Sequence, residues 1–488
     1  MKRLQIFNVR FGFATNSSST HSLLFLPENH NINDDMVEEE DFGWQYFTAI
    51  SENAKRRYLA HTLRHGITAP ENISNLVTEN WSGTQYNLDG YIDHQSLMNL
   101  PLAFGSKFPD EQFFKELLQW VLQPNLAILG GNDNMDDDDP NDRHPLGFGF
   151  ALPLDRDGFS NIVCRKEKDY WILFDRGNGT RIRFRFCNNK DEMIIAPQKP
   201  SAPELIDLKL TNFCPYNCPM CYQNSSVKKE EENDTYHLGS SLAALKVFEV
   251  AIGGGEPTWA KHFKETIRHF HGLGITCNFS TRNLDWLRNP SEVEQIIPYT
   301  GAFAYSLIGP NDLKGDKNKV KELFSLLNAN GILQEGSESK KTKASLHAIV
   351  GPKCFEMYDI QSLLNTANEY DFPITLLGFK QTGRGADVKV EPNFYKGLIK
   401  EIKTWRKQQK FASPIGIDTT LASYLQKELK EEGISDLLYT TKEGVYSCYI
   451  DMTQNKIGPS SYCSPEQMMP VENNYWEEEA ITKAFARF

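Results

Sequence analysis

Three cysteines lie close together near the middle of the chain, at the spacing C-x3-C-x2-C. They are Cys214, Cys218 and Cys221, and they follow a short apolar segment at 205–210. Three thiolates on one loop can bind three corners of an iron–sulfur cube and leave the fourth iron open to a ligand from solution. A structural zinc site is the alternative, and it requires a fourth ligand such as His237 or Cys277. The spacing therefore predicts a metal centre, with a 4Fe-4S cluster as the main hypothesis.

A glycine-rich motif forms a second candidate for chemistry. Gly254, Gly255, Glu256 and Pro257 come directly after the apolar segment 249–252. Glycines without a Cβ let a ligand or another backbone approach closely. Taken alone, the motif is also typical of an ordinary turn. Its meaning depends on whether the fold brings it next to the cysteines.

The elements that must position both motifs are strands alternating with helices. Apolar segments typical of short buried strands lie at 205–210, 249–252, 275–280, 302–306, 345–350 and 374–377. Segments with apolar residues at helical spacing lie between them. We therefore predict an α/β fold with a partial (β/α)6 barrel as its core, since six units are too few for a closed eight-stranded barrel. Ligands of such sheets bind beyond the carboxyl ends of the strands, where both motifs lie.

The core resembles the radical S-adenosylmethionine (SAM) superfamily. The resemblance rests on the strand, the C-x3-C-x2-C loop and a second strand that ends in Gly-Gly-Glu-Pro, and it covers about residues 203–383. It implies that the cysteines hold a 4Fe-4S cluster whose free iron binds SAM. It also implies that an electron passed into the cluster cleaves SAM to methionine and a 5′-deoxyadenosyl radical, which abstracts a hydrogen atom from the substrate.

The same resemblance implies roles for residues at the strand ends. The residues expected to contact SAM are Tyr216, Met220, Gly254, Gly255, Glu256, Pro257, Ser280, Thr281, Asn283 and Ser306. Met220 stands where the family usually has an aromatic residue, and Arg282 interrupts the usual ribose-binding sequence. Capping of a helix remains the alternative role of Thr281 and Asn283. The loop 378–385 is expected to bind adenine through its backbone, or a substrate carboxylate through Lys380 or Arg384. No catalytic residue is assigned.

Two further cysteines lie near the C-terminus, as C-x9-G-x4-C. Cys448 and Cys463 flank Gly458, which is expected at the turn of a hairpin. The pattern resembles the start of the SPASM or twitch extension of radical SAM enzymes. No cysteine follows Cys463, so we expect a degenerate extension without a metal. An auxiliary cluster at Cys448 and Cys463 stays the alternative, and it would need distant donors such as Cys354 or Cys164.

The remainder of the chain divides into an N-terminal and a C-terminal part. We predict an α+β accessory domain at 1–200, the core at 201–385, and a helical linker with the small extension at 386–488. Within the first part, alternating residues at 162–186 indicate a hairpin, and the acidic stretches 34–41 and 132–142 are typical of solvated loops. The polar run 15–22 is expected to be a turn, a linker or a ligand contact. The role of the accessory domain is not predicted.

Composition limits the classes of function. The chain has 488 residues, of which 52 are basic and 64 acidic, so its net charge is −12. Its mean hydropathy is −0.49, and it has no apolar run of the roughly 18 residues that cross a bilayer. We therefore expect no membrane association and, since no signal-peptide core is present, a reducing cytoplasmic location. The acidic balance disfavours nucleic-acid binding without excluding it.

These observations leave three hypotheses for function. The first is a radical SAM enzyme that modifies a peptide or protein by hydrogen abstraction, using 4Fe-4S, SAM and a reducing electron donor. The peptide substrate follows from the resemblance of the C-terminal part to the SPASM region. The second is radical modification of a nucleotide or nucleic-acid base. The third is a non-catalytic binding protein in which the metal only holds the fold together.

Overall fold

The computed structural model describes most of the chain after residue 198 and isolated segments before it. The described residues are 3–10, 41–42, 47–49, 53–54, 56–57, 91–92, 128–130, 162–176, 179–187, 198–230, 232–315, 318–333, 343–409, 413–435, 438–471 and 476–488. The acidic stretch 132–142, residues 34–40 and the polar run 15–22 lie outside them. The predictions made for those segments therefore stay predictions.

A ten-stranded sheet is the main element of the described chain, with the order β15-β14-β13-β12-β11-β10-β9-β16-β17-β18. Neighbouring strands are parallel from β15 to β16, and β17 and β18 add an antiparallel edge. The strands are β9 (Leu205–Thr211), β10 (Glu249–Gly254), β11 (Thr276–Thr281), β12 (Ala302–Leu307), β13 (Lys343–Val350), β14 (Ile374–Gly378), β15 (Ile415–Ile417), β16 (Ser447–Asp451), β17 (Lys456–Gly458) and β18 (Met469–Pro470).

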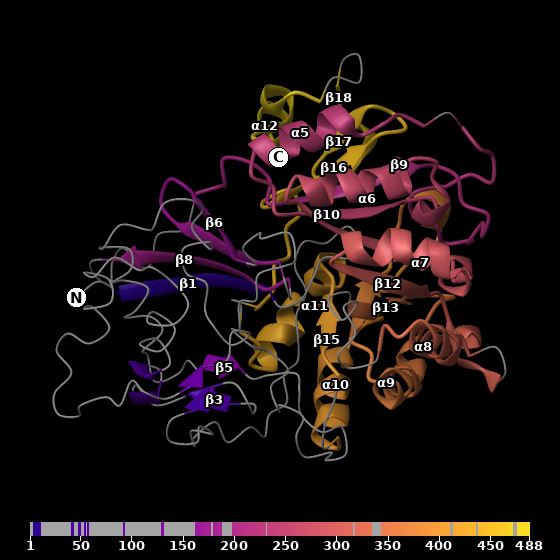
Figure 1. Ribbon diagram of the computed structural model, residues 1–488. Helices are drawn as coiled ribbons and strands as arrows, with labels where there is room; N and C mark the ends of the chain where they lie inside the picture. The colour runs from indigo at the N-terminus through magenta and orange to yellow at the C-terminus, as the bar shows by residue number, and fades with distance from the viewer. Residues whose placement is uncertain are drawn as a thin grey trace.

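Helices connect the parallel strands, and α6 to α9 follow one side of the sheet (Figure 1). The helices are α5 (Tyr236–Ala244), α6 (Phe263–Gly272), α7 (Pro290–Ile296), α8 (Lys319–Ala329), α9 (Ile360–Glu369), α10 (Leu398–Lys407), α11 (Thr419–Glu431) and α12 (Glu478–Phe485). Their apolar residues recur at helical spacing, as in α6, where Phe263, Ile267 and Phe270 are buried. Burial of this stripe against the sheet holds each helix in place.

The six predicted β/α units are confirmed as β9 to β14, each strand within two residues of its expected bounds. The sheet is larger than predicted, because β15 and β16 extend it on both sides. β16 pairs in parallel with β9, so the sheet continues well past residue 385. The expected C-terminal hairpin is present as β16 and β17, but Gly458 is the last residue of β17 rather than the turn. The turn lies at 452–455, where Asn455 has a φ of 52°.

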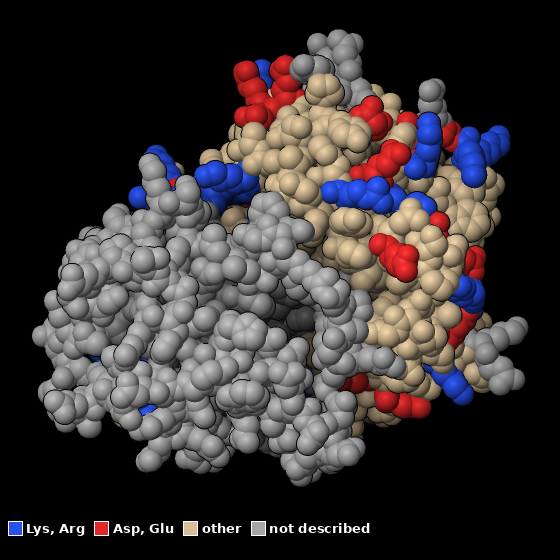
Figure 2. Space-filling model, viewed as in Figure 1, with Lys and Arg blue, Asp and Glu red and all other residues tan. Residues whose placement is uncertain are grey.

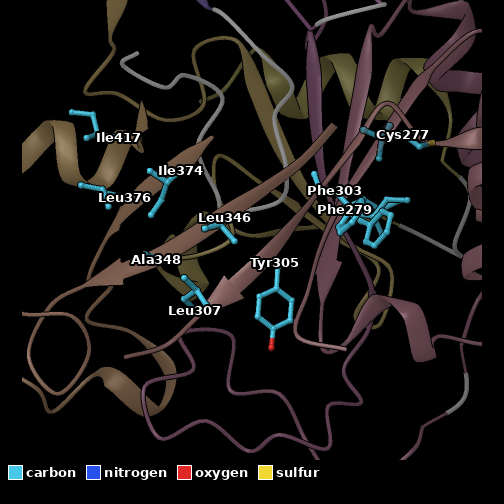
Figure 3. Packing of buried hydrophobic residues seen from close by; sticks show 14 of the residues in the cluster. Cys277, Phe279, Phe303, Tyr305, Leu307, Leu346, Ala348, Ile374, Leu376 and Ile417 are labelled. Atoms are coloured by element: carbon cyan, nitrogen blue, oxygen red, sulfur yellow. The ribbon is translucent and has the colours of Figure 1, made fainter. Parts of the chain in front are cut away.

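The two faces of the sheet have opposite character. On β9, Ile206, Leu208 and Leu210 belong to the main apolar core, so the alternating Asp207 and Lys209 point to the other face. Figure 3 shows the same core around the neighbouring strands. We call the side of the sheet that carries Asp207 and Lys209 the inner face. A polar inner face at the centre of a parallel sheet is where a polar ligand can be bound.

A second sheet, with the order β1-β8-β7-β6, is built from the N-terminal part of the chain. Its strands are β1 (Arg3–Arg10), β6 (Ile162–Lys166), β7 (Trp171–Asp175) and β8 (Arg181–Cys187), and all of its pairs are antiparallel. The predicted hairpin within 162–186 is therefore confirmed as β7 and β8, and β6 adds a third strand to it. Two short pairs also occur, between β2 (Asp41–Phe42) and β4 (Tyr91–Ile92) and between β3 (Phe47–Ala49) and β5 (Ile128–Gly130).

A buried cluster of ionic side chains joins the two sheets at the amino ends of β9 and β10. Arg181 donates to Glu204 at 2.9 Å and to Glu249 at 2.6 Å, and Arg183 donates to Glu204 at 2.6 Å. Asn278 donates to the second oxygen of Glu249 at 2.9 Å. The side chains of the two arginines and two glutamates are fully buried. We call Arg181, Arg183, Glu204 and Glu249 the ionic lock, because they tie β8 to the base of the main sheet.

The surface view shows Lys and Arg side chains interspersed with Asp and Glu over the described part of one face (Figure 2). Among the described helices, none is long and apolar enough to cross a membrane.

Candidate active site at the strand ends

The cysteine loop begins at the carboxyl end of β9 and folds back on itself. Cys214 donates its backbone N–H to Ser226 at 2.7 Å, and Ser226 donates to Asn212 at 2.8 Å. Cys214, Cys218 and Cys221 are free and half-buried. Burial raises the pKa of Cys214 to about 11 and also raises that of Cys218. The thiols of Cys214 and Cys218 therefore keep their protons at neutral pH, and a metal must displace these protons on binding.

The position of Cys277 in the fold tests one of the two zinc alternatives for the cysteine loop. Within the described residues, no three or more His, Cys, Asp or Glu side chains are arranged as a metal site. The three cysteines thus share one loop but do not form a closed ligand set. Cys277, proposed as a fourth zinc ligand, is buried in the apolar core beside Phe279 (Figure 3). Cys277 lies near the amino end of β11, whereas the cysteine loop lies at the carboxyl ends of the strands. A zinc site that uses Cys277 is therefore excluded.

Gly254 and Gly255 pack directly against β9 and the cysteine loop. Gly254 has a φ of +108°, and a Cβ there would lie 2.6 Å from the carbonyl oxygen of Thr211. A Cβ on Gly255 would lie 2.0 Å from the carbonyl oxygen of Phe213. Gly255 also donates its N–H to Thr211 at 2.7 Å. The two glycines therefore let the second motif lie against the backbone of the first.

The substitution Gly255→Ala is expected to destabilise the protein by about 1–3 kcal/mol and to lower its capacity to bind iron, because the new methyl group displaces the cysteine loop. Gly272→Ala is the matched control, since a Cβ there has no neighbour within 4 Å. Thermal unfolding and iron content after reconstitution measure the two effects. Equal unfolding temperatures and iron contents in both variants would contradict the assigned contact.

Glu256 holds together the turns that follow β10 and β11. Its carboxylate accepts from Thr281 Oγ1 at 2.6 Å, from Thr258 Oγ1 at 2.8 Å and from the backbone N–H of Arg282 at 2.9 Å. Asn283 donates its side-chain amide to Thr258 Oγ1 at 3.0 Å. Burial raises the pKa of Glu256 although these hydrogen bonds favour its ionised form. Glu256, Thr281 and Asn283 therefore form one network beside Gly254 and Gly255, which we call the glycine wall.

Arg282 connects the third and fourth strand ends to the cysteine loop. Its guanidinium forms a two-pronged ion pair with Asp312, each N–O distance being 3.2 Å. It also lies 5.8 Å from the ring centroid of Tyr216, a cation–π distance. Asp312 in turn accepts the backbone N–H of Ile308 at 2.7 Å. Arg282, which departs from the family pattern, thus links Asp312 to Tyr216 of the cysteine loop.

Ser280 and His347 meet on the inner face across the intervening strand β12. Ser280 Oγ and His347 Nδ1 are 3.3 Å apart. Ser306 of β12 lies opposite His347 in the register and is half-buried. Burial lowers the pKa of His347 to about 3, with the charge of Lys380 acting in the same direction. His347 is therefore neutral at pH 7, and its imidazole can donate one hydrogen bond and accept another.

A buried charged group lies between β14, β15 and the C-terminal part. Lys380 pairs with Asp418 at 3.3 Å, and its ammonium lies 4.8 Å and 5.4 Å from the rings of Tyr222 and Tyr462. Burial lowers the pKa of Lys380, but Asp418 outweighs this and raises it. Burial also raises the pKa of Glu443 well above its ordinary value. Because Lys380 already pairs with Asp418, the structure gives it a partner other than a substrate carboxylate.

The two C-terminal cysteines, Cys448 and Cys463, differ in burial. Cys448 is 1 % exposed on β16 and belongs to the apolar core, whereas Cys463 is half-buried and next to Tyr462. Tyr462 connects the C-terminal part to the site through its cation–π contact with Lys380. In the described chain, neither cysteine is part of a group of three metal-binding side chains. A degenerate extension therefore remains our prediction for this segment.

Sequence reasoning found the strand-end motifs but missed the contacts that hold them. Arg384 is the clearest case: the sequence suggested a substrate carboxylate as its partner, and the structure shows its side chain bound to backbone carbonyls of the cysteine loop. Asp312 and Ser225, which also support the loop, carried no sequence signal. Arg384 and Cys218 are 166 positions apart, so only the parallel sheet order could have indicated that they meet.

No family model matches the chain. Among curated proteins, the PqqA peptide cyclase of Rhodopseudomonas palustris is 34% identical over 83 residues, or 16% of this chain and 22% of that protein. Mycofactocin maturase MftC of Mycolicibacterium smegmatis is 26% identical over 190 residues, or 38% of this chain and 47% of that protein. The matches therefore span less than half the length of these relatives.

Among solved structures, SuiB of Streptococcus suis bound to its precursor peptide SuiA has a TM-score of 0.48 at 14% identity, covering 67% of this chain and 90% of that one. The enzyme anSMEcpe with bound AdoMet has a TM-score of 0.38 at 14% identity, covering 58% and 83%. The homologues found by sequence are radical SAM enzymes. The resemblance stated from the cysteine loop and the Gly-Gly-Glu-Pro motif is therefore confirmed, and this chain is a relative of the radical SAM enzymes.

Proposed function

We propose that this chain is a radical SAM enzyme that modifies a peptide or protein substrate. The observation that carries the proposal is the packing of the Gly254–Gly255 backbone against the loop with Cys214, Cys218 and Cys221. A cysteine loop and a glycine wall side by side at the strand ends provide a place for a cluster and for a ligand of its free iron. The cluster and SAM would supply the 5′-deoxyadenosyl radical.

The residues of this chain would hold and orient these groups. Cys214, Cys218 and Cys221 would bind three irons of the cluster. The Glu256 network would keep the glycine wall in place, and the ring of Tyr216 lies 5.8 Å from the guanidinium of Arg282. Ser280 and Ser306 would face SAM from the inner face. Radical chemistry at an exposed iron needs a reducing compartment, so we propose a cytoplasmic location.

A peptide substrate is supported by the relatives and by the character of the inner face. The name of PqqA peptide cyclase refers to a peptide. The inner face offers charged and neutral hydrogen-bonding groups, including Lys209, which pairs with Asp451 at 3.5 Å. The net charge of −12 disfavours a substrate with a phosphate backbone.

The test is anaerobic reconstitution with iron and sulfide, followed by low-temperature electron paramagnetic resonance and chromatography for 5′-deoxyadenosine. We expect a reduced-cluster signal that shifts when SAM is added, together with 5′-deoxyadenosine. Peptides encoded by short reading frames next to the gene are then supplied, and mass spectrometry detects a SAM-dependent mass change. A stable cluster that does not respond to SAM would contradict the proposal. A mass change confined to added RNA or nucleosides would contradict its peptide part.

A further inference from the structure

Thr382 and Arg384, in the loop after β14, donate four hydrogen bonds to the cysteine loop. Arg384 donates its backbone N–H to Cys221 at 3.0 Å, its Nε to Cys218 at 2.8 Å and its Nη1 to Ser225 at 2.6 Å, each to the carbonyl oxygen. Thr382 Oγ1 donates to the carbonyl oxygen of Tyr222 at 3.3 Å. These bonds fix the half of the loop that carries the second and third cysteines.

The two loops meet backbone to backbone. Gly383 has a φ of +57°, and a Cβ there would lie 2.4 Å from the carbonyl oxygen of Tyr222 and 2.5 Å from that of Cys221. The hydroxyl of Ser225 then reaches the carbonyl oxygen of Gly254 at 3.3 Å. Arg384 is thus connected through Ser225 to the glycine wall. A guanidinium is suited to this position because its planar fork reaches carbonyls seven residues apart, whereas a lysine has a single donor atom.

No carboxylate of the described residues balances the charge of Arg384. Arg282 pairs with Asp312 and Lys380 pairs with Asp418, but Arg384 forms no ion pair with any residue that the structure describes. Its side chain is half-buried and its bonding partners are neutral carbonyl groups. A cation in such a place is stabilised when an anionic group binds nearby. A cluster held by three thiolates is anionic, and each added electron makes it more negative.

We propose that Arg384 is a positioning residue for the cluster: it holds the half of the cysteine loop that carries Cys218 and Cys221, and it stabilises the reduced cluster through its charge. This inference rests on the proposed function. Net charge and hydrogen bonding around a cluster set its reduction potential, so loss of the guanidinium shifts the potential to a more negative value. The cluster then accepts its electron less readily from a given reductant.

The experiment compares Arg384→Met, which removes the charge, with Arg384→Lys, which keeps the charge and removes the fork. Each protein is reconstituted anaerobically, and its iron content and unfolding temperature are measured. The one-electron reduction potential of the cluster is measured by redox titration monitored by electron paramagnetic resonance. We expect at least a tenfold lower ratio of reduced to oxidised cluster in Arg384→Met at a fixed potential. We expect Arg384→Lys to recover most of that ratio with a broadened signal. Arg288→Met is the control, since Arg288 is exposed and pairs with Asp285 and Glu322.

The outcomes separate this inference from the proposed function. If the wild-type protein forms no cluster that responds to SAM, the proposed function is overturned. In that case the control Arg288→Met also lacks such a cluster. Full iron and an unchanged potential in both Arg384 variants overturn the inference alone. A collapse of the unfolding temperature in both variants also overturns it, because it indicates a general structural role. Loss of iron at an unchanged unfolding temperature supports the positioning role.

Discussion

Replacing Cys218 with alanine is expected to leave the fold intact and to reduce SAM cleavage below detection. Two thiolates cannot hold a cluster whose fourth iron is open, so the cluster is not retained. Cys218 is half-buried on a loop and is not part of the apolar core. Replacing its side chain with a methyl group therefore leaves no cavity in the core. Iron content, the circular dichroism spectrum and 5′-deoxyadenosine formation test the three parts of this expectation.

Cys463→Ala is the matched control for that experiment. Cys463 is also a half-buried free cysteine, but it lies in the C-terminal part, where we predict no metal. We expect its iron content and its 5′-deoxyadenosine formation to equal those of the wild type. Undiminished cleavage of SAM by Cys218→Ala would disprove the assignment of the cluster loop. Loss of about half of the iron in Cys463→Ala would instead indicate an auxiliary cluster.

Replacing Glu204 with glutamine is expected to destabilise the protein by about 3–5 kcal/mol, because it removes the buried carboxylate that pairs with Arg181 and Arg183. Glu292→Gln is the matched control. Glu292 pairs with Lys264 at 2.9 Å, but both side chains are about one-third exposed, so we expect a loss of under about 1 kcal/mol. Chemical denaturation of both variants measures the difference. Equal losses would contradict the importance of burial in the ionic lock.

The ionic lock also predicts how stability depends on pH. Burial alone raises the pKa of Glu204, but the charges of Arg183 and Arg181 outweigh it and lower the pKa to about 2. A carboxyl whose pKa is lower in the folded protein contributes stability above its unfolded pKa of about 4.3 and loses it as the pH falls towards 2. We expect the wild type to lose about 3 kcal/mol from this group over that range. The Glu204→Gln variant lacks this part of the acid transition.

The strands of the core could be predicted because each is a short apolar segment between turn residues. The extra strand β16 could not, since its place beside β9 depends on pairing between segments about 240 positions apart. β8 shows a second limit. Its alternation of arginines with apolar residues predicts a strand, but charged residues usually face solvent, and here Arg181 and Arg183 are fully buried. Burial of a charge becomes favourable only when Glu204 and Glu249 arrive from other segments.

At the candidate site, residue types with specific chemistry were recognisable and residues that act through geometry were not. The three cysteines are identified by spacing alone. Glu256 was found by motif, whereas its bonds to Thr281 and Arg282 follow from the parallel order of β10 and β11. Arg384 was assigned to a ligand because a cationic loop at a strand end commonly binds anions. Its actual partners are carbonyl oxygens, which no sequence pattern distinguishes.

The pairing of β16 with β9 has a consequence for synthesis of the protein on the ribosome. β9 is the first strand of the core to emerge, yet one of its edges stays unpaired until residues 447–451 have been made. An open edge on an almost wholly buried strand invites pairing with other chains. Truncated chains that end before residue 447 are therefore expected to aggregate, even though they contain every residue of the cysteine loop.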